Sequence, residues 1–206
     1  MKTPTHKTPY TKHILLITLF LIAFLERTVF DLGANIELVT MAMILASCCL
    51  GRKEAFWLIL AIMATTDRVI GNTPILLFTW SGFLIPAFFI KGGYLKINHY
   101  LKLRLKLKNI LLPKLLTLTG LGLTSNVFFF LWTNFGVWLL DSWGMYPNTL
   151  PGLLMSYING LPFLKNQFIS SLIFIPAGIV AIEAAKSLHK KYVSSFAKLY
   201  RKVATS

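Results

Sequence analysis

Apolar residues gather into six blocks along this chain, separated by short polar or charged stretches. The blocks cover residues 14–30, 38–50, 55–70, 75–90, 115–140 and 168–185. A helix needs roughly 20 largely apolar residues to cross a bilayer, and several of these blocks are shorter. Length alone therefore does not separate a membrane helix from a buried helix of a soluble protein. The pattern predicts an all-α protein with six helices.

Basic residues fall between alternate blocks. If the first block enters from the cytoplasm and each later block crosses, the cytoplasmic segments hold 18 of the 21 lysines and arginines. Four acidic residues lie on the opposite side: Asp31, Glu37, Asp67 and Asp141. An excess of Lys and Arg in cytoplasmic loops is the signal that orients membrane helices. We therefore expect an integral membrane bundle of six transmembrane helices in the cell (plasma) membrane, with both termini in the cytoplasm.

The composition supports the same class. Of 206 residues, 55% are hydrophobic and only 14% are charged, with a net charge of +14. This composition excludes a disordered protein and argues against an ordinary soluble enzyme. A large positive charge also suits a nucleic-acid binder. No nucleic-acid fold explains basic residues that are confined to alternate loops, so we expect no nucleic-acid partner.

Three regions follow from this topology: a basic cytoplasmic tail at 1–13, a six-helix membrane domain at 14–185, and a basic tail at 186–206. Apolar and basic positions of the last tail recur at helical spacing, so we expect an amphipathic helix on the lipid surface. The alternative is a docking site for a cytoplasmic coupling subunit. Glu26-Arg27 and the lack of a small-x-small site argue against a cleaved signal peptide in the first block.

Catalytic constellations are hard to find. The four histidines have no Glu or Cys at ligand spacing, which argues against a metal site. Cys48 and Cys49 are neighbours within an apolar block, where we expect them to act as small packing residues. No nucleophile, base and orienting group form a plausible triad. We expect no enzyme activity, no metal and no cofactor.

Ionisable groups at membrane depth raise a functional question. Glu26-Arg27 and Asp67-Arg68 end two helices on the same predicted side. They form either ion pairs that hold the helix ends together or contacts to a ligand.

The fifth block carries polar residues at Asn126, Thr133, Asn134 and Trp138. These side chains either form hydrogen bonds between helices or contact a ligand. The segment 141–167 that follows is long for a simple turn and contains Trp143, Tyr146 and Tyr157. Its apolar part, 153–164, is too short to span, so we expect an outer interfacial or re-entrant segment between helices five and six.

The residues of this region also resemble those of a known family. The run from Thr133 to Trp138, Tyr146-Pro147, Thr149, Gly152-Leu153, Tyr157 and Pro162-Phe163 resembles a family of uncharacterised prokaryotic membrane proteins. That family is similar to the substrate-binding S components of energy-coupling-factor vitamin transporters. S components commonly carry an Ala-x-x-x-Ala stripe on the first helix, which docks the energising subunit. Here the spacing occurs at Ala42 and Ala46, in the second block.

The resemblance implies an S-component-like bundle that binds a small solute at its extracytoplasmic face. It also implies an energising transmembrane subunit with ATPases as a partner, besides the lipid bilayer. A small, flat or acidic solute would suit the residue types. An alternative is a membrane scaffold or assembly subunit that binds a protein partner and no solute. The candidate ligand-binding residues are Arg27, Asn35, Glu37, Asp67, Arg68, Asn134, Trp138, Tyr146 and Tyr157.

Overall fold

The computed structural model describes residues 9–30, 32–71, 73–104 and 111–204. Within these ranges every regular element is helical, which confirms the all-α class. The basic residues of 1–8 and residues 105–110 lie outside the described residues, as do the side chains of 196–204.

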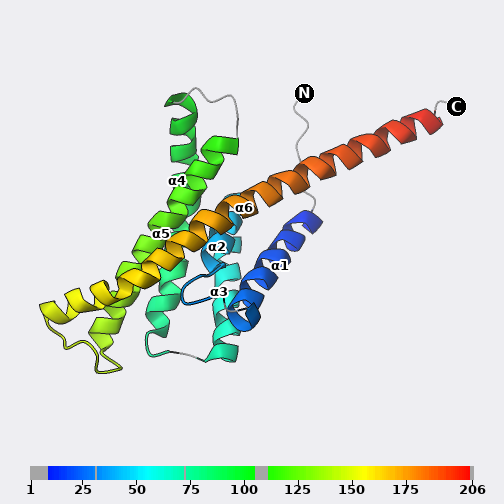
Figure 1. Ribbon diagram of the computed structural model, residues 1–206. Helices are drawn as coiled ribbons and strands as arrows, with labels where there is room; N and C mark the ends of the chain where they lie inside the picture. The colour runs from blue at the N-terminus through cyan, green and yellow to red at the C-terminus, as the bar shows by residue number, and fades with distance from the viewer. Residues whose placement is uncertain (1–8, 31, 72, 105–110, 205–206) are drawn as a thin grey trace.

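The described residues form six α-helices and one π-helical turn (Figure 1). Helix α1 (Pro9–Leu25) runs directly into the π-helical turn η1 (Glu26–Phe30). The short helix α2 (Val39–Cys49) is followed by α3 (Arg52–Ile70). The three long helices are α4 (Leu76–Arg104), α5 (Leu111–Leu140) and α6 (Leu150–Ala204).

Four helical segments of the described chain are long and apolar enough to cross a membrane. They are Lys12–Phe30, Leu76–Arg104, Leu111–Leu140 and Leu150–Ser195. These lengths and compositions indicate a membrane protein. Helix α2 has only 11 residues, too few to cross a bilayer by itself. Six crossings therefore stay a prediction.

Successive helices alternate in direction, which separates the charged junctions into two ends (Figure 1). Helices α3 and α5 finish near Asp67 and Asp141 at what we call the acidic end. Helix α3 starts at Arg52-Lys53, and α4 continues through Lys91 to Arg104, at what we call the basic end. The end of α4 and the start of α5 project together past the α2–α3 turn (Figure 1).

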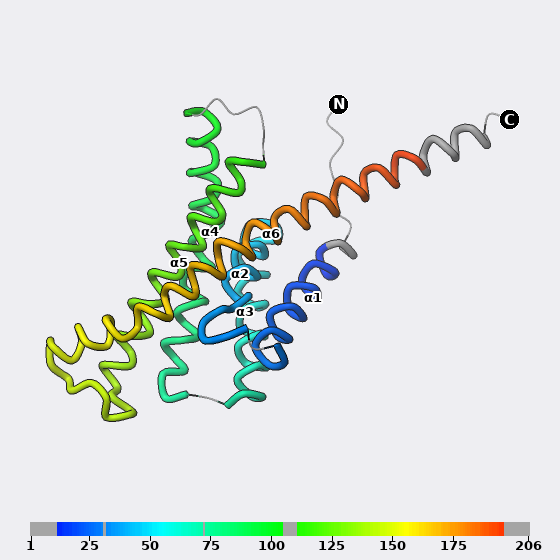
Figure 2. The backbone as a smooth tube through the Cα atoms, viewed as in Figure 1, coloured from blue at the N-terminus to red at the C-terminus, as the bar shows by residue number. Residues whose placement is uncertain are grey.

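The expected separate outer segment between helices five and six is wrong, because most of it belongs to helix α6. Residues 150–167, including the stretch 153–164, are the beginning of one 55-residue helix that continues into the basic tail. Only 141–149 are non-helical. At 1.5 Å per residue this helix is about 80 Å long, against a hydrocarbon core of about 30 Å. It crosses the bundle obliquely, and its C-terminal part extends beyond the other helices (Figure 2).

The end of an apolar block does not always mark the end of a helix. Asn166 and Gln167 interrupt the last apolar run, but the helix satisfies its own backbone there and uses both residues to contact neighbours. The Asn166 amide donates to the Ala34 carbonyl at 2.9 Å, and the Gln167 carbonyl accepts from Asn126 at 2.9 Å. Helix α4 likewise continues beyond Lys91, where the apolar block ends, because a helix satisfies its own backbone hydrogen bonds whether its side chains are polar or apolar.

Helix α2 lies in the core, and every residue from Val39 to Ser47 is buried. The first N–H groups of a helix have no partner within it, so a buried start needs acceptors from elsewhere. Glu37 supplies them: one carboxylate oxygen accepts from the Thr40 N–H at 2.9 Å and the other from the Thr40 hydroxyl at 2.5 Å. Glu26 accepts from the Leu38 N–H at 3.1 Å. Two carboxylates at the positive end of the helix dipole therefore stabilise its burial.

Polar contacts also join α2 and α5 to α6. Ser170 accepts from the Glu37 N–H at 3.2 Å and donates to the Glu37 carbonyl at 2.6 Å. The Asn126 amide donates to Ser171 at 2.8 Å as well as to Gln167, and its oxygen accepts from Thr40 at 3.3 Å. Asn126 therefore forms hydrogen bonds between helices, one of the two roles that its position in an apolar block allowed.

Removing the Glu37 carboxylate should destabilise the fold, because the first turn of α2 would then be buried without its acceptor. We expect Glu37→Ala to lower the free energy of unfolding by about 2 kcal/mol, within the range for lost caps and unsatisfied buried donors. The measurement is thermal unfolding of the detergent-solubilised protein. Glu54→Ala is the control, because Glu54 forms a partly exposed ion pair with Lys12 and its loss should cost less than about 1 kcal/mol. Equal effects of the two substitutions would contradict the role of Glu37 as a cap.

Candidate functional site

A cleft lies at the acidic end, where the chain turns from α5 into α6. Its volume is about 290 Å³. The last turns of α5, the connection 141–149 and the first turns of α6 form its walls. The lining residues are Asn134, Val137, Trp143, Met145, Tyr146, Asn159, Gly160 and Phe163.

Hydrogen bonds fix the connection that covers this cleft. The Trp138 indole N–H lies 3.2 Å from the Pro147 carbonyl and 3.0 Å from the Thr149 carbonyl. Asp141 accepts from the Tyr146 N–H at 2.9 Å. Because these contacts tie both halves of the loop to the end of α5, the cleft has a defined shape before any ligand enters.

The polar groups in the cleft are amides and a phenol. The Asn159 amide donates to the Tyr146 hydroxyl at 3.1 Å. Asn134 lies opposite Gly160, where a Cβ atom would come within 2.5 Å of the Asn134 side-chain oxygen. Glycine at this position therefore gives the Asn134 amide its place between α5 and α6.

None of the lining residues carries a charge, and the apolar wall includes Val137, Trp143, Met145 and Phe163. Aromatic faces with a few convergent hydrogen-bonding groups are typical of small-molecule sites. The arrangement suits a small, flat and uncharged molecule.

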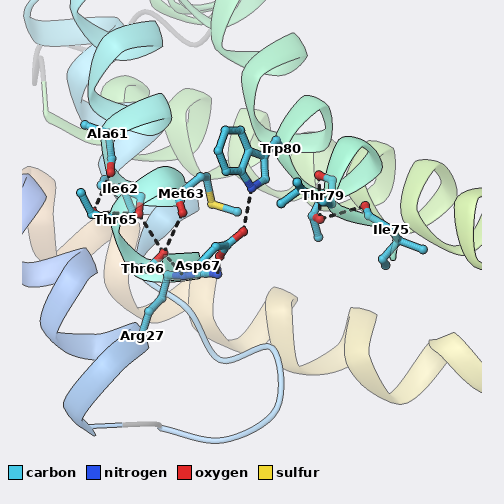
Figure 3. Close-up of polar contacts among 11 residues, drawn as sticks. Arg27, Ala61, Ile62, Met63, Thr65, Thr66, Asp67, Ile75, Thr79 and Trp80 are labelled. Atoms are coloured by element: carbon cyan, nitrogen blue, oxygen red, sulfur yellow. Dashed lines mark hydrogen bonds and ion pairs between the residues drawn. The ribbon is translucent and has the colours of Figure 1, made fainter. Parts of the chain in front are cut away.

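A separate cluster at the acidic end joins η1, α3 and α4 (Figure 3). Arg27 forms an ion pair with Asp67, with Nη2 and Oδ1 2.8 Å apart, and its Nε donates to the Thr66 hydroxyl at 3.0 Å. The second carboxylate oxygen of Asp67 accepts from the Trp80 indole at 2.7 Å. The Arg27 and Asp67 side chains are only 19% and 9% exposed. Of the two roles that the sequence left open for these charges, Arg27 and Asp67 therefore take the first: they form an ion pair that holds helix ends together.

The nine candidate residues occupy several places in the fold. Asn134 and Tyr146 line the cleft, and Trp138 holds its loop. Tyr157 lies beside it, with its hydroxyl 3.3 Å from the Leu131 carbonyl and its ring against Phe130. Arg27 and Asp67 join in the cluster just described.

The other three candidates lie elsewhere. Glu37 caps α2, and burial raises the pKa of its carboxyl, although hydrogen bonds from Thr40 oppose that shift. Asn35 is exposed, with a positive φ of 58° in the turn before α2, and Arg68 is exposed at the end of α3. A ligand-binding role of these residues stays a prediction.

Sequence reasoning did not single out several residues of these sites. Asn159 lies within the apolar stretch 153–164 and gave no separate signal, yet its spacing of four from Phe163 places both on one face of a helix. Thr66 and Trp80 gave no signal that distinguished them from core residues, because only the packing of α3 against η1 and α4 brings them to Arg27 and Asp67. Within the described ranges, no group of three His, Cys, Asp or Glu side chains is placed to hold a metal ion.

Together these features define a helical protein of the membrane type with a small, uncharged cleft at one end. The chain belongs to the family described as a family of unknown function, DUF6580, whose model matches residues 7–194. No curated protein and no solved structure gives a significant match. Membership of an uncharacterised family is thereby confirmed, and the resemblance to S components stays a prediction.

The Arg27–Asp67 pair offers a direct test of which charges at this end hold the fold. Arg27→Gln should lower the free energy of unfolding by about 2 to 3 kcal/mol, because it leaves the largely buried Asp67 carboxylate without its cation. Arg68→Gln removes the same charge from an exposed neighbour and should change stability by less than about 0.5 kcal/mol. Thermal unfolding in detergent measures both. A loss with Arg68→Gln as large as with Arg27→Gln would show that net charge, and not this pair, matters.

Proposed function

We propose that this protein binds a small solute in the cleft between α5 and α6 and acts as a substrate-binding subunit of an energy-coupling-factor type transporter. The observation that carries the proposal is the cleft itself. Its loop is fixed by Trp138 and Asp141, and amide and aromatic side chains converge within it.

The size of the cleft limits the solute. Its volume of about 290 Å³ is at the lower edge of the range for small-molecule pockets. One ring system with a few polar substituents fits such a volume. Trp143 and Phe163 would pack against the ring, while Asn134, Asn159 and Tyr146 would pair with its polar edge.

The charges near the acidic end refine the ligand class. The sequence suggested a flat or acidic molecule because two arginines fall on this side. Arg27 is occupied by Asp67 and Thr66, and Arg68 is exposed at the end of α3, so neither lines the cleft. An uncharged ligand therefore suits the site better than an acidic one.

The distribution of charge supports an extracytoplasmic cleft, because the basic residues gather at the other end of the bundle. The solute would enter from outside, lie under the connection 141–149 and leave inward when the bundle moves against an energising partner. Ala42 and Ala46 are completely buried, so they pack inside the bundle and are not available to such a partner. Helix α1 instead exposes an apolar row: Ile14, Ile17, Leu21 and Leu25.

Solute binding predicts ligand-dependent stability. A library of uncharged vitamins, nucleobases and related heterocycles should contain a compound that raises the melting temperature of the purified protein. At 100 times Kd the stabilisation is about 2.7 kcal/mol, which corresponds to several degrees for a chain of this size. Trp143→Ala and Asn159→Ala should each weaken binding about tenfold by removing the apolar wall or the amide.

Asn148→Ala is the matched control, because Asn148 is exposed on the same connection and does not line the cleft. Trp138→Ala should also reduce uptake, since it removes both indole contacts to the loop. If the library gives no shift and Trp138→Ala leaves uptake of every solute unchanged, the solute-binding proposal is wrong. A scaffold that binds a protein partner would then be the better account.

A further inference from the structure

A second cavity lies at the basic end, between the start of α3 and the middle of α4. Its volume is about 550 Å³. We call it the basic cavity, because three of its lining residues are Arg52, Lys53 and Lys91. The remaining lining residues are Leu50, Gly51, Glu54, Gly92 and Leu95.

The cations reach this cavity from two helices. A Cβ atom built at Gly92 on α4 would lie 3.5 Å from Nη2 of Arg52, so the Arg52 guanidinium extends from α3 across the α4 backbone. A Cβ atom at Gly51 would lie 3.8 Å from Nζ of Lys91, so the Lys91 ammonium extends in the opposite sense. Positive groups that repel one another are thus held on facing walls.

The acid in the lining, Glu54, offsets only part of this positive charge. Glu54 accepts from Lys12 of α1 at 2.6 Å, and this hydrogen bond lowers the pKa of the Glu54 carboxyl. The carboxylate therefore stays ionised, is paired with Lys12 and also attracts the nearby Lys91. Arg52, Lys53 and Lys91 remain in excess, and the N–H groups at the start of α3 add a partial positive charge. The electrostatics of the cavity favour an anion.

An aromatic surface lies one helical turn away from the cations, toward the middle of the bundle. Phe56 on α3 packs against Phe88 on α4, with ring centroids 5.6 Å apart, and against Trp57 at 5.3 Å. Trp57 is 65% exposed and Phe88 is 45% exposed. An anion-binding cavity is thus followed directly by an open apolar surface on the same pair of helices.

We propose that the basic cavity binds the phosphate group of an anionic phospholipid, whose acyl chain lies on Phe56, Trp57 and Phe88. Basic pockets between membrane helices are suited to acidic lipid headgroups. Free phosphate would use the cations but leave the aromatic surface uncovered. The cavity also lies where the apolar block of α4 gives way to Lys91, which is the level of the membrane interface. This proposal is independent of solute binding in the cleft at the acidic end.

The test uses Trp57 as a reporter. The full-length protein is reconstituted into phosphatidylcholine vesicles that contain a minor share of phosphatidylglycerol, with bromine on the acyl chains of either one lipid or the other. Bromine quenches a nearby indole, and the contribution of Trp57 is the difference between the protein and its Trp57→Phe variant. We expect brominated phosphatidylglycerol to quench Trp57 several-fold more, at equal mole fraction, than brominated phosphatidylcholine.

Variants that remove one charge each test whether the preference for phosphatidylglycerol arises from the basic cavity. Arg52→Gln and Lys91→Gln should each reduce the selectivity for phosphatidylglycerol about fivefold, and the double variant should abolish it. Lys190→Gln removes one charge from an exposed site on α6, outside the cavity, and should leave the selectivity unchanged. Size-exclusion profiles of the variants verify that they remain folded.

Three results would overturn the proposal. Equal quenching by the two brominated lipids would exclude a preference for the anionic headgroup. An equal loss with Lys190→Gln and with Lys91→Gln would indicate general attraction between the basic protein and the surface. Unchanged selectivity in the double variant would place the preference outside the basic cavity.

Discussion

The burial of the short helix α2 is the constraint on which this bundle depends. A helix of 11 residues enclosed by its neighbours places its unpaired N–H groups where water cannot reach them. Glu37 and Glu26 accept from these groups, and Ser170 of α6 holds the Glu37 backbone. Because Glu26 belongs to η1, the same contacts set where α1 ends and how α6 crosses the core.

The same need for partners explains why some polar side chains join helices while others line the cleft and the basic cavity. In an apolar bundle each polar side chain needs a partner, so most of them hold helices together. Arg27 and Asp67 join η1 to α3, and Asn126 joins α5 to α6. Open polar surface is left where helices end: the uncharged cleft between α5 and α6, and the basic cavity beside α3 and α4. The two sites differ in charge because no charged residue lines the cleft, whereas Arg52, Lys53 and Lys91 line the basic cavity.

Much of the fold could be predicted from the sequence, because apolar runs bounded by charges define helices directly. The starts of α2 and α4 and the ends of α3 and α5 lie within a residue or so of the predicted positions. The course of α6 could not be predicted, because the hydropathy of a residue does not show whether the helix continues through it. Asn166 and Gln167 read as a boundary, yet they are helical residues that contact the turn before α2 and α5. The two ends of the Arg27–Asp67 pair were identifiable as partners, whereas Trp80 was not.

The sequence by itself determined the class of protein and the separation of charge, since both depend on the order of apolar and basic residues along the chain. It also selected Asn134 and Tyr146, whose place beside a loop rich in aromatics was visible without coordinates. Only the tertiary structure decided which polar groups are free to meet a ligand. A side chain is available or occupied according to what packs against it, and residues far apart in the chain settle that for Arg27 and Lys91.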